Sequence, residues 1–138
     1  MTEARDVMDA VTAAVMAGDT DRLRGLYAPD AVATTPEGEL HGREEIASWM
    51  AVFSTAFPDT RFEIIAERDV GDTAMDEAYL IGTHTGPLPG PGGEVPPTGR
   101  AVRLRECDVA TVRDGLIREH HFYYDRAQLM EQLGLVPA

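Results

Sequence analysis

The sequence contains little cysteine and few basic residues. Cys107 is the single cysteine among 138 residues, which excludes an internal disulfide and a cysteine-rich zinc site. We expect its side chain to be a small, half-buried apolar group. Twelve Lys and Arg residues stand against 24 Asp and Glu residues, giving a formal net charge of −12. Nucleic-acid binders need a basic surface, so we expect no nucleic-acid partner.

The sequence also lacks a long apolar run. Its first twenty residues include Glu3, Asp6 and Asp9, which argues against a signal peptide, and no stretch approaches the ~18 apolar residues of a membrane span. No glycine-rich loop precedes a helix, so nothing indicates nucleotide binding. We therefore expect a soluble, cytoplasmic protein without a membrane partner. The length predicts one domain over residues 1–138.

The most informative stretch runs from residue 102 to residue 125, where Asp114-Gly115 joins two segments rich in β-branched and aromatic residues. An Asp-Gly pair in this setting predicts a β-hairpin, because both turn positions require a positive φ. With a two-residue loop, Arg113 lies opposite Leu116, and this register decides which side chains share a face.

In that register one face of the hairpin is aliphatic at both ends and polar in its middle, which is typical of the floor of a pocket. The polar residues expected to crowd together there are Glu106, Asp108, His121, Tyr123 and Asp125, and Glu119 falls on the same face. Carboxylates close to a histidine in a dry cleft shift one another's pKa and can supply an acid and a base together. The alternative is a solvated ladder of ion pairs at a sheet edge. A change of one residue in the turn would instead bring in His120, Tyr124 and Cys107.

The hairpin arginines fall on the other face in this register. A solvated or subunit-contacting sheet surface suits such long cations. Arg103 or Arg105 reaching into the cavity would contradict the register.

Helical spacing of apolar residues predicts three helices before the long strands. They cover residues 3–17, a short segment that ends before Pro29, and residues 42–57. The third helix carries Trp49 and Phe53, which we expect in the core and as candidates for lining a pocket. Strands are expected at residues 31–35, 62–67 and 74–85, and Asp125 or Arg126 starts a short last helix.

Residues 86–99 contain five prolines and several glycines, so we expect an irregular loop and interpret it as a flap over the pocket mouth. A surface loop without function is the alternative. His84, just before the loop, would point into the mouth or bond the loop backbone. The order of elements predicts an α+β fold, in which a curved, mostly antiparallel sheet wraps around three N-terminal helices as a cone-shaped barrel and a short helix follows.

Several motifs extend over nearly the whole chain in the order known from one family. They are Leu26–Ala31, Gly42–Ile46, Phe57–Asp59, Gly82–Gly86, Pro96–Arg100, Asp114–His120 and Gln132–Leu135. With them the sequence resembles the SnoaL-like polyketide and ester cyclases of the nuclear transport factor 2-like superfamily. The resemblance implies the cone fold and a cofactor-free, metal-free intramolecular aldol closure on an aromatic polyketide ester, in which an aspartate of the last strand moves the proton. By analogy with the superfamily, we also expect a homodimer through the outer sheet face that carries the hairpin arginines.

The chain departs from this family at one position. Many members have His-Trp-Asp where this chain has His120-His121-Phe122, so Phe122 occupies the place of the aspartate. The proton-transfer role then falls to Asp108 or Asp125 with His121 as partner, and these three are the predicted catalytic residues. The predicted substrate contacts are Tyr123, Glu106, His84, Trp49, Phe53 and Tyr27.

Together these expectations describe a cofactor-independent cyclase or isomerase that acts on a hydrophobic, polyketide-like carbonyl compound. One alternative is a non-catalytic module that holds an apolar ligand in the same cone. Another is an epoxide hydrolase, which needs a carboxylate pair and an arginine inside the cavity. No ligand spacing demands a metal, and the resemblance implies a reaction without a cofactor, so we expect neither.

Overall fold

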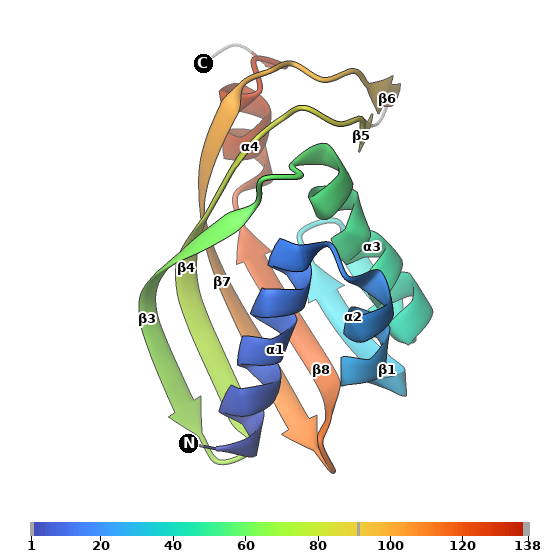
Figure 1. Cartoon of the computed structure of the whole chain (residues 1–138), viewed down its shortest axis with the longest axis vertical. Helices are drawn as coiled ribbons and strands as arrows, with labels where there is room; N and C mark the ends of the chain where they lie inside the picture. Colours follow the sequence, from blue (N-terminus) through green and yellow to red (C-terminus); the bar gives the residue numbers. More distant parts are fainter. Residues whose placement is uncertain (1, 91, 137–138) are drawn as a thin grey trace.

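The computed structural model describes residues 2–90 and 92–136, which form helices packed on one face of a curved sheet (Figure 1). Helices α1 and α2 precede strands β1 and β2, helix α3 and six further strands, and helix α4 comes last (Figure 1). The elements are α1 Glu3–Ala17, α2 Thr20–Leu26, β1 Tyr27–Thr35, β2 Gly38–His41, α3 Arg43–Ala56, β3 Arg61–Val70, β4 Thr73–Thr83, β5 Leu88–Gly90, β6 Gly93–Val95, β7 Ala101–Arg113, β8 Leu116–Tyr124 and α4 Arg126–Gln132. The predicted α+β fold is confirmed.

The main sheet has six strands in the order β2-β1-β8-β7-β4-β3. Every neighbouring pair is antiparallel except β1 and β8, which run parallel. The parallel pair arises because helix α3 and the strands after it separate β1 from β8 in the chain, so β8 returns to the middle of the sheet. The sheet is therefore mixed but mostly antiparallel.

The helix boundaries follow from local chemistry. The side chain of Thr2 accepts a hydrogen bond from the backbone N–H of Arg5 at the start of α1, and Gly18 ends this helix with a φ of +66°. Asp19 caps α2 and Asp125 caps α4 in the same way as Thr2 caps α1. No helix among the described residues is long and apolar enough to cross a membrane.

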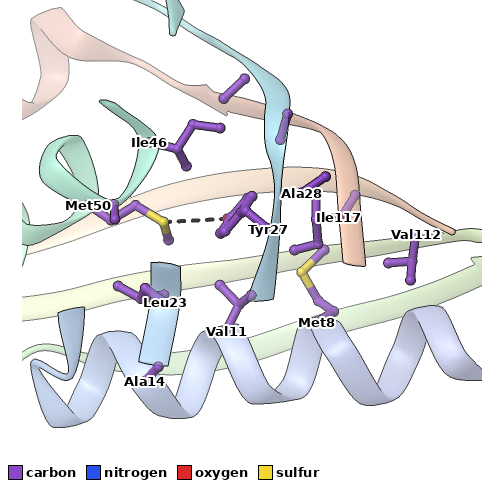
Figure 2. Packing of buried hydrophobic residues seen from close by; sticks show 14 of the residues in the cluster. Met8, Val11, Ala14, Leu23, Tyr27, Ala28, Ile46, Met50, Val112 and Ile117 are labelled. Atoms are coloured by element: carbon purple, nitrogen blue, oxygen red, sulfur yellow. Dashed lines mark hydrogen bonds between the residues drawn. The ribbon is translucent and has the colours of Figure 1, made fainter. Parts of the chain in front are cut away.

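Two apolar clusters stabilise the fold. The larger one joins α1, α2 and α3 to the middle of the sheet and contains Met8, Val11, Leu23, Ile46 and Ile117 (Figure 2). The smaller one joins the end of α3, the start of β7 and α4, with Phe57, Leu104, Leu129 and Leu133 at its centre. Because burial of each large apolar side chain contributes about 1.5–3 kcal/mol, these clusters hold the helices against the sheet.

The β7–β8 hairpin follows the predicted register only near its turn. Arg113 pairs with Leu116 and Val112 with Ile117, as the Asp114-Gly115 turn predicts, but Thr111 then pairs with Glu119. Arg118 is thus an extra residue in β8. Such a bulge exchanges the faces of the residues beyond it in one strand and leaves the other strand unchanged.

The predicted face of β8 is therefore wrong beyond Arg118, whereas that of β7 is correct. Three residues of β8 point toward the helices: His120, Phe122 and Tyr124. On β7, Asp108 lies opposite Phe122 and Glu106 lies opposite Tyr124, and both acids point toward the helices too. The bulged Arg118 extends toward Asp114 and Asp30, at 3.7 and 4.0 Å. The predicted outward placement of the β7 arginines is correct, since the side chains of Arg103 and Arg105 are more than half exposed.

The segment between β4 and β7 contains more regular structure than expected. Leu88–Gly90 and Gly93–Val95 pair as a two-stranded ribbon, although the prolines and glycines of this segment had suggested that no ladder could form. Gly86 lies so close to the carbonyl of Thr55 that any side chain there would clash, so the segment leaves the sheet in close contact with α3. The ribbon lies at the end of the molecule near α4 (Figure 1).

Candidate functional site

Carboxylates and aromatic rings lie side by side on the inner face of the sheet. In one row Asp76 of β4 pairs with Asp108 of β7, which pairs with Phe122 of β8. In the next row Glu106 of β7 pairs with Tyr124 of β8. Residues two apart in a strand share a face, so three acids on β4 and β7 adjoin two aromatic rings on β8.

A cavity of about 70 Å³ lies between this part of the sheet and helices α1 and α3. Its lining residues are Val11, Thr12, Val15, Trp49, Met50, Phe53, Phe62, Ile64, Asp76, Leu80, Leu104, Glu106, Asp108, Phe122 and Tyr124. Ile64 of the edge strand β3, one of these residues, is 43 % exposed, so part of the lining is in contact with solvent. The volume suits a small organic group and is below the ~300 Å³ typical of pockets for drug-sized ligands.

Asp108 ends a chain of buried hydrogen bonds. Its Oδ2 lies 2.7 Å from Nε2 of His120, and Nδ1 of His120 lies 2.7 Å from the hydroxyl of Tyr27. We assign the imidazole proton to Nε2, which donates to Asp108, so that Nδ1 accepts from the Tyr27 hydroxyl. The sulfur of Met50 lies 3.5 Å from the same hydroxyl (Figure 2). The chain fixes the position of the Asp108 carboxylate in the cavity wall.

The neighbours of His120 explain how an imidazole fits inside the sheet. Ala110 of β7 and Ala33 of β1 pair with His120 on either side, and such small side chains leave room for the ring. The ring of Phe122 stacks on His120 with their centroids 3.9 Å apart. His120 is fully buried, and its two ring nitrogens have partners, as burial of a polar group requires.

Glu106 has the most strongly altered acidity in the cavity wall. Burial, the negative charge of Asp108 and a hydrogen bond to Asp108 raise the pKa of Glu106 from 4.5 to about 10. At neutral pH Glu106 is therefore a neutral carboxylic acid that can donate a hydrogen bond. Burial and the charge of Asp108 likewise raise the pKa of the Tyr27 hydroxyl, which stays protonated.

The third carboxylate, Asp76, is held from behind by a buried arginine. Arg5 of α1 lies 2.6 Å from Asp76, and its guanidinium also contacts Asp69 at 2.7 Å and Glu67 at 2.6 Å. Burial raises the pKa of Asp76, an effect that the hydrogen bond from Arg5 opposes. This ion pair gives Asp76 a counter-ion, and Arg5 is not among the residues that line the cavity.

Several of the residues predicted from the sequence lie at this cavity. Asp108, Glu106, Trp49 and Phe53 line it, and Tyr27 lies behind its wall, bonded to His120. Tyr27 begins β1, whereas the sequence pattern had placed it in the second helix. What these residues do to a bound molecule stays a prediction.

Other predicted residues lie elsewhere. His121 and Tyr123 are on the outer face, with the Tyr123 side chain 53 % exposed, because the bulge at Arg118 moves them there. Asp125 caps α4 by accepting a hydrogen bond from the N–H of Gln128. The grouping of His121, Tyr123 and Asp125 with Asp108 at one pocket is therefore wrong.

His84 is fully buried outside the cavity. Its Nδ1 accepts a hydrogen bond from the backbone N–H of Thr98, and its ring packs against Phe57. Burial lowers the pKa of His84, which favours the neutral ring that this bond needs. His84 thus joins the two ends of the segment 86–99, in agreement with the option that it bonds the loop backbone.

The predicted flap does not cover this cavity. The described residues of segment 86–99 contribute nothing to its lining, and Leu88, Gly90 and Val95 instead border a shallow groove of about 490 Å³ beside α4. Within residues 2–90 and 92–136 no cluster of His, Cys, Asp or Glu has the geometry to hold a metal ion.

Sequence reasoning missed His120, Asp76, Phe122 and Tyr124. The strand pairing brings Asp76 to Asp108 across 32 positions of the sequence, and no local pattern signals that contact. The other three residues lie on β8. The alternative register considered for the hairpin turn pointed to them, since it would have brought His120 and Tyr124 to the inner face. A bulge confined to β8 brings these residues inward while Cys107 stays on the outer side of β7.

Comparison with known proteins places this geometry in a family. The model of the SnoaL-like polyketide cyclases matches residues 5–133. The chain belongs to this family. IdmH of Streptomyces antibioticus, provisionally named a polyketide cyclase, is 30 % identical, with a TM-score of 0.78 over 96 % of this chain and 99 % of IdmH. No curated protein sequence matches the chain.

Two other solved structures share the fold at lower identity. A protein of Jannaschia sp. CCS1, provisionally named a SnoaL-like polyketide cyclase, is 22 % identical, with a TM-score of 0.84 over 98 % of this chain and 94 % of the other. A protein of Catenulispora acidiphila with a ketosteroid isomerase-like fold is also 22 % identical, with a TM-score of 0.76 over 95 % and 94 % of the two chains. That protein was crystallised in complex with trimethylamine. These likenesses show the nuclear transport factor 2-like fold.

Proposed function

We propose that this SnoaL-like chain catalyses proton transfer on an enolisable carbonyl compound, as a cofactor-independent cyclase or isomerase. The observation that carries the proposal is the Asp108 carboxylate in the cavity wall, oriented by His120 at 2.7 Å and adjacent to Glu106. A fixed carboxylate can remove an α-proton, and a neutral carboxylic acid can donate a hydrogen bond to the carbonyl oxygen as the enolate forms. Asp108 is the proposed base and Glu106 the proposed donor.

Membership of the polyketide cyclase family supports a hydrophobic, polyketide-like substrate. Aromatic rings from α3 and β8 supply a wall on which a planar conjugated compound can stack. A cavity of about 70 Å³ admits only part of such a compound, so its reactive end would enter between α1 and β3. Phe122 stacks on His120 where the family's aspartate would stand, and Asp108 takes over the base role in this proposal.

The proposal can be tested without the natural substrate. Acetophenone in D2O exchanges the hydrogens of its methyl group for deuterium when a base removes them, and 1H NMR follows this exchange. We expect wild-type protein to accelerate the exchange and Asp108→Asn to lose about 10²–10⁴ of that acceleration. Glu106→Gln, which keeps a neutral donor, should retain most of it. Glu119→Gln, an exposed change on the outer side of the same hairpin, is the matched control.

Equal exchange by wild-type protein and Asp108→Asn would contradict the assignment of the base. Acceleration that is lost equally in Glu106→Gln and Asp108→Asn would contradict the neutral-donor role of Glu106.

A second candidate is a non-catalytic module that binds a small molecule in the same cavity. Phe122 at the position of the family's aspartate favours it, since the chain lacks the proton-transfer group of that position. So does the binding of trimethylamine by the related protein of Catenulispora acidiphila. The epoxide hydrolase alternative lacks support, because the cavity-lining residues among those described include no arginine.

We also propose a cytoplasmic homodimer that associates through the outer face of the sheet. That face carries Tyr79 with Arg103 stacked 3.5 Å from its ring centre, and the exposed Tyr123 on β8. Tyrosine and arginine are enriched in protein interfaces. Size-exclusion chromatography with light scattering should give twice the chain mass of 15.0 kDa, and a monomer would contradict the proposal.

A further inference from the structure

The cavity wall contains a carboxylate without a cationic counter-ion among the described residues that line it. Asp76 has Arg5 at 2.6 Å, whereas the partners of Asp108 are the imidazole of His120 at 2.7 Å and the carboxylic acid of Glu106. Among the described residues, none of those that line the cavity is Lys or Arg. A carboxylate in an apolar wall with no lysine or arginine beside it favours a ligand that brings positive charge.

The wall beside this carboxylate is built of aromatic rings. Trp49 of α3 meets Phe53 edge to face, with ring centroids 5.2 Å apart, and meets Phe122 at 4.9 Å. Phe53 in turn meets Tyr124 edge to face at 6.0 Å. Four rings from two elements thus form one continuous surface. The faces of aromatic rings carry negative potential and attract organic cations, most strongly where water is excluded.

Size agrees with the same class of ligand. The cavity of about 70 Å³ has room for a few heavy atoms, and its remaining lining from α1 and β3 is mostly aliphatic. An ammonium group with methyl substituents presents an apolar surface and a diffuse positive charge, so it matches aliphatic, aromatic and carboxylate walls together. A small carboxylate would instead meet the negative charge of Asp108.

From the Asp108 carboxylate with no lysine or arginine in the described cavity lining, the aromatic wall and the cavity size together, we propose that the cavity is a binding site for methylated ammonium groups. Asp108 supplies the charge, and Trp49, Phe53, Phe122 and Tyr124 supply the ring surface. The site discriminates by charge, taking a cationic group in preference to a neutral one of equal shape and excluding an anionic one. This goes beyond the proposed function, because it holds whether or not Asp108 transfers a proton.

The test uses three probes of similar shape and different charge on the full chain. They are choline, its neutral carbon analogue 3,3-dimethyl-1-butanol and the anion 3,3-dimethylbutanoate, each titrated by isothermal calorimetry and by 1H–15N NMR. We expect choline to shift the signals of cavity residues and to bind about tenfold or more tightly than the neutral analogue, because a desolvated cation–aromatic contact adds to the attraction of Asp108. The anion should not bind.

Variants locate the binding. Asp108→Asn, nearly equal in shape, should abolish the preference for choline while the neutral analogue still binds. Trp49→Leu should lower the affinity for choline at least tenfold. Glu119→Gln removes an exposed charge from the same hairpin and should leave both affinities unchanged. If Asp108→Asn fails to fold, two measurements still test the proposal. They are the affinity of Trp49→Leu for choline and the comparison of choline with its neutral analogue on the wild-type protein.

Equal binding of choline and its neutral analogue would overturn the proposal, because the cavity would then be an apolar sleeve. Choline binding of equal affinity in wild type and Asp108→Asn would also overturn the proposal, because the overall negative charge of the protein would then explain the binding. Failure of the proposed function is seen separately: the chain would bind choline with the stated preference but would not accelerate deuterium exchange in acetophenone.

Discussion

The two faces of the β7–β8 hairpin carry the same kinds of side chain in opposite environments. His120 on the inner face is fully buried and has partners at 2.7 Å on both ring nitrogens. His121 on the outer face has a partly exposed side chain, 3.3 Å from the Tyr123 hydroxyl and 3.9 Å from Glu119. The two histidines are neighbours in the chain, yet His120 belongs to the core and the candidate site, whereas His121 lies on the surface.

The acids differ in the same way. Glu106 and Asp108 share a hydrogen bond inside the sheet, and the pKa of Glu106 rises to about 10. On the outer face Glu77 pairs with Arg105, and Glu63 pairs with Arg103, both exposed to solvent. Water and nearby cations stabilise a carboxylate, whereas an apolar cavity and a second carboxylate favour its neutral form. The environment, rather than the residue type, decides which acids can take part in proton chemistry.

The largest expected difference lies between the two histidines. His120→Ala should lower the free energy of unfolding by about 3 kcal/mol or more, since it opens a cavity and removes the buried partners of Tyr27 and Asp108. His121→Ala should change it by less than about 0.5 kcal/mol. Urea unfolding followed by circular dichroism measures both. Comparable losses in the two variants would disprove the contrast between the faces.

The next effect is a dependence on pH that Glu106 creates. Since the folded chain keeps the Glu106 proton up to a pKa of about 10 and the unfolded chain releases it near 4.5, folded protein binds more protons between these values. The free energy of unfolding therefore falls as pH rises through this window. Glu106→Gln should gain stability over wild type by several degrees in Tm between pH 5 and pH 9.

The outer-face control for this prediction is Glu119→Gln, whose Tm should run parallel to wild type across the same pH range. If the difference in Tm between Glu106→Gln and wild type does not increase as pH rises, Glu106 is ionised in the folded protein and its assignment as a neutral donor is wrong.

A smaller effect distinguishes the tyrosines that contact the two histidines. Tyr27→Phe removes the hydroxyl 2.7 Å from His120 Nδ1 and should cost about 1–2 kcal/mol of unfolding free energy, because a buried acceptor loses its donor. Tyr123→Phe removes a hydroxyl at 3.3 Å from exposed His121 and should cost almost nothing. Parallel chemical denaturation curves provide the comparison, in which equal midpoints would count against the buried hydrogen-bond chain.

The smallest effect is expected at the outer-face ion pairs. Glu77→Gln, which breaks the exposed pair with Arg105, should leave Tm within about a degree of wild type, since solvent and salt screen such pairs. Scanning calorimetry at low and high salt measures it. A marked loss of Tm in the monomer at low salt would show that the outer face contributes to stability as much as the inner one.

Much of the fold could be predicted from local patterns. The spacing of apolar residues in 3–17 and 42–57 predicted both long helices within a residue or two. Asp114-Gly115 gave the hairpin turn, where Asp114 has a φ of +54° and Gly115 of +76°. These features depend on residues close together in the chain, which is why the sequence alone reveals them.

The candidate site could be predicted only in part. Glu106, Asp108, Trp49 and Phe53 were named, because β7 keeps its register from the turn and α3 keeps its period. The β8 residues assigned to the site were shifted by one position, because the sequence contains no local signature of the bulge at Arg118. Asp125 was ambiguous, and the structure uses it as a helix cap.

The sequence by itself determined the class of the fold, the helices, the hairpin turn and membership of the SnoaL-like family, because each follows from periodicity or from short motifs. Tertiary structure decided which histidine is buried, that Asp76 meets Asp108, and that Arg5 pairs with Asp76 whereas His120 contacts Asp108. Those contacts join residues far apart in the chain, and strand register and packing, which respond to the whole core at once, set them.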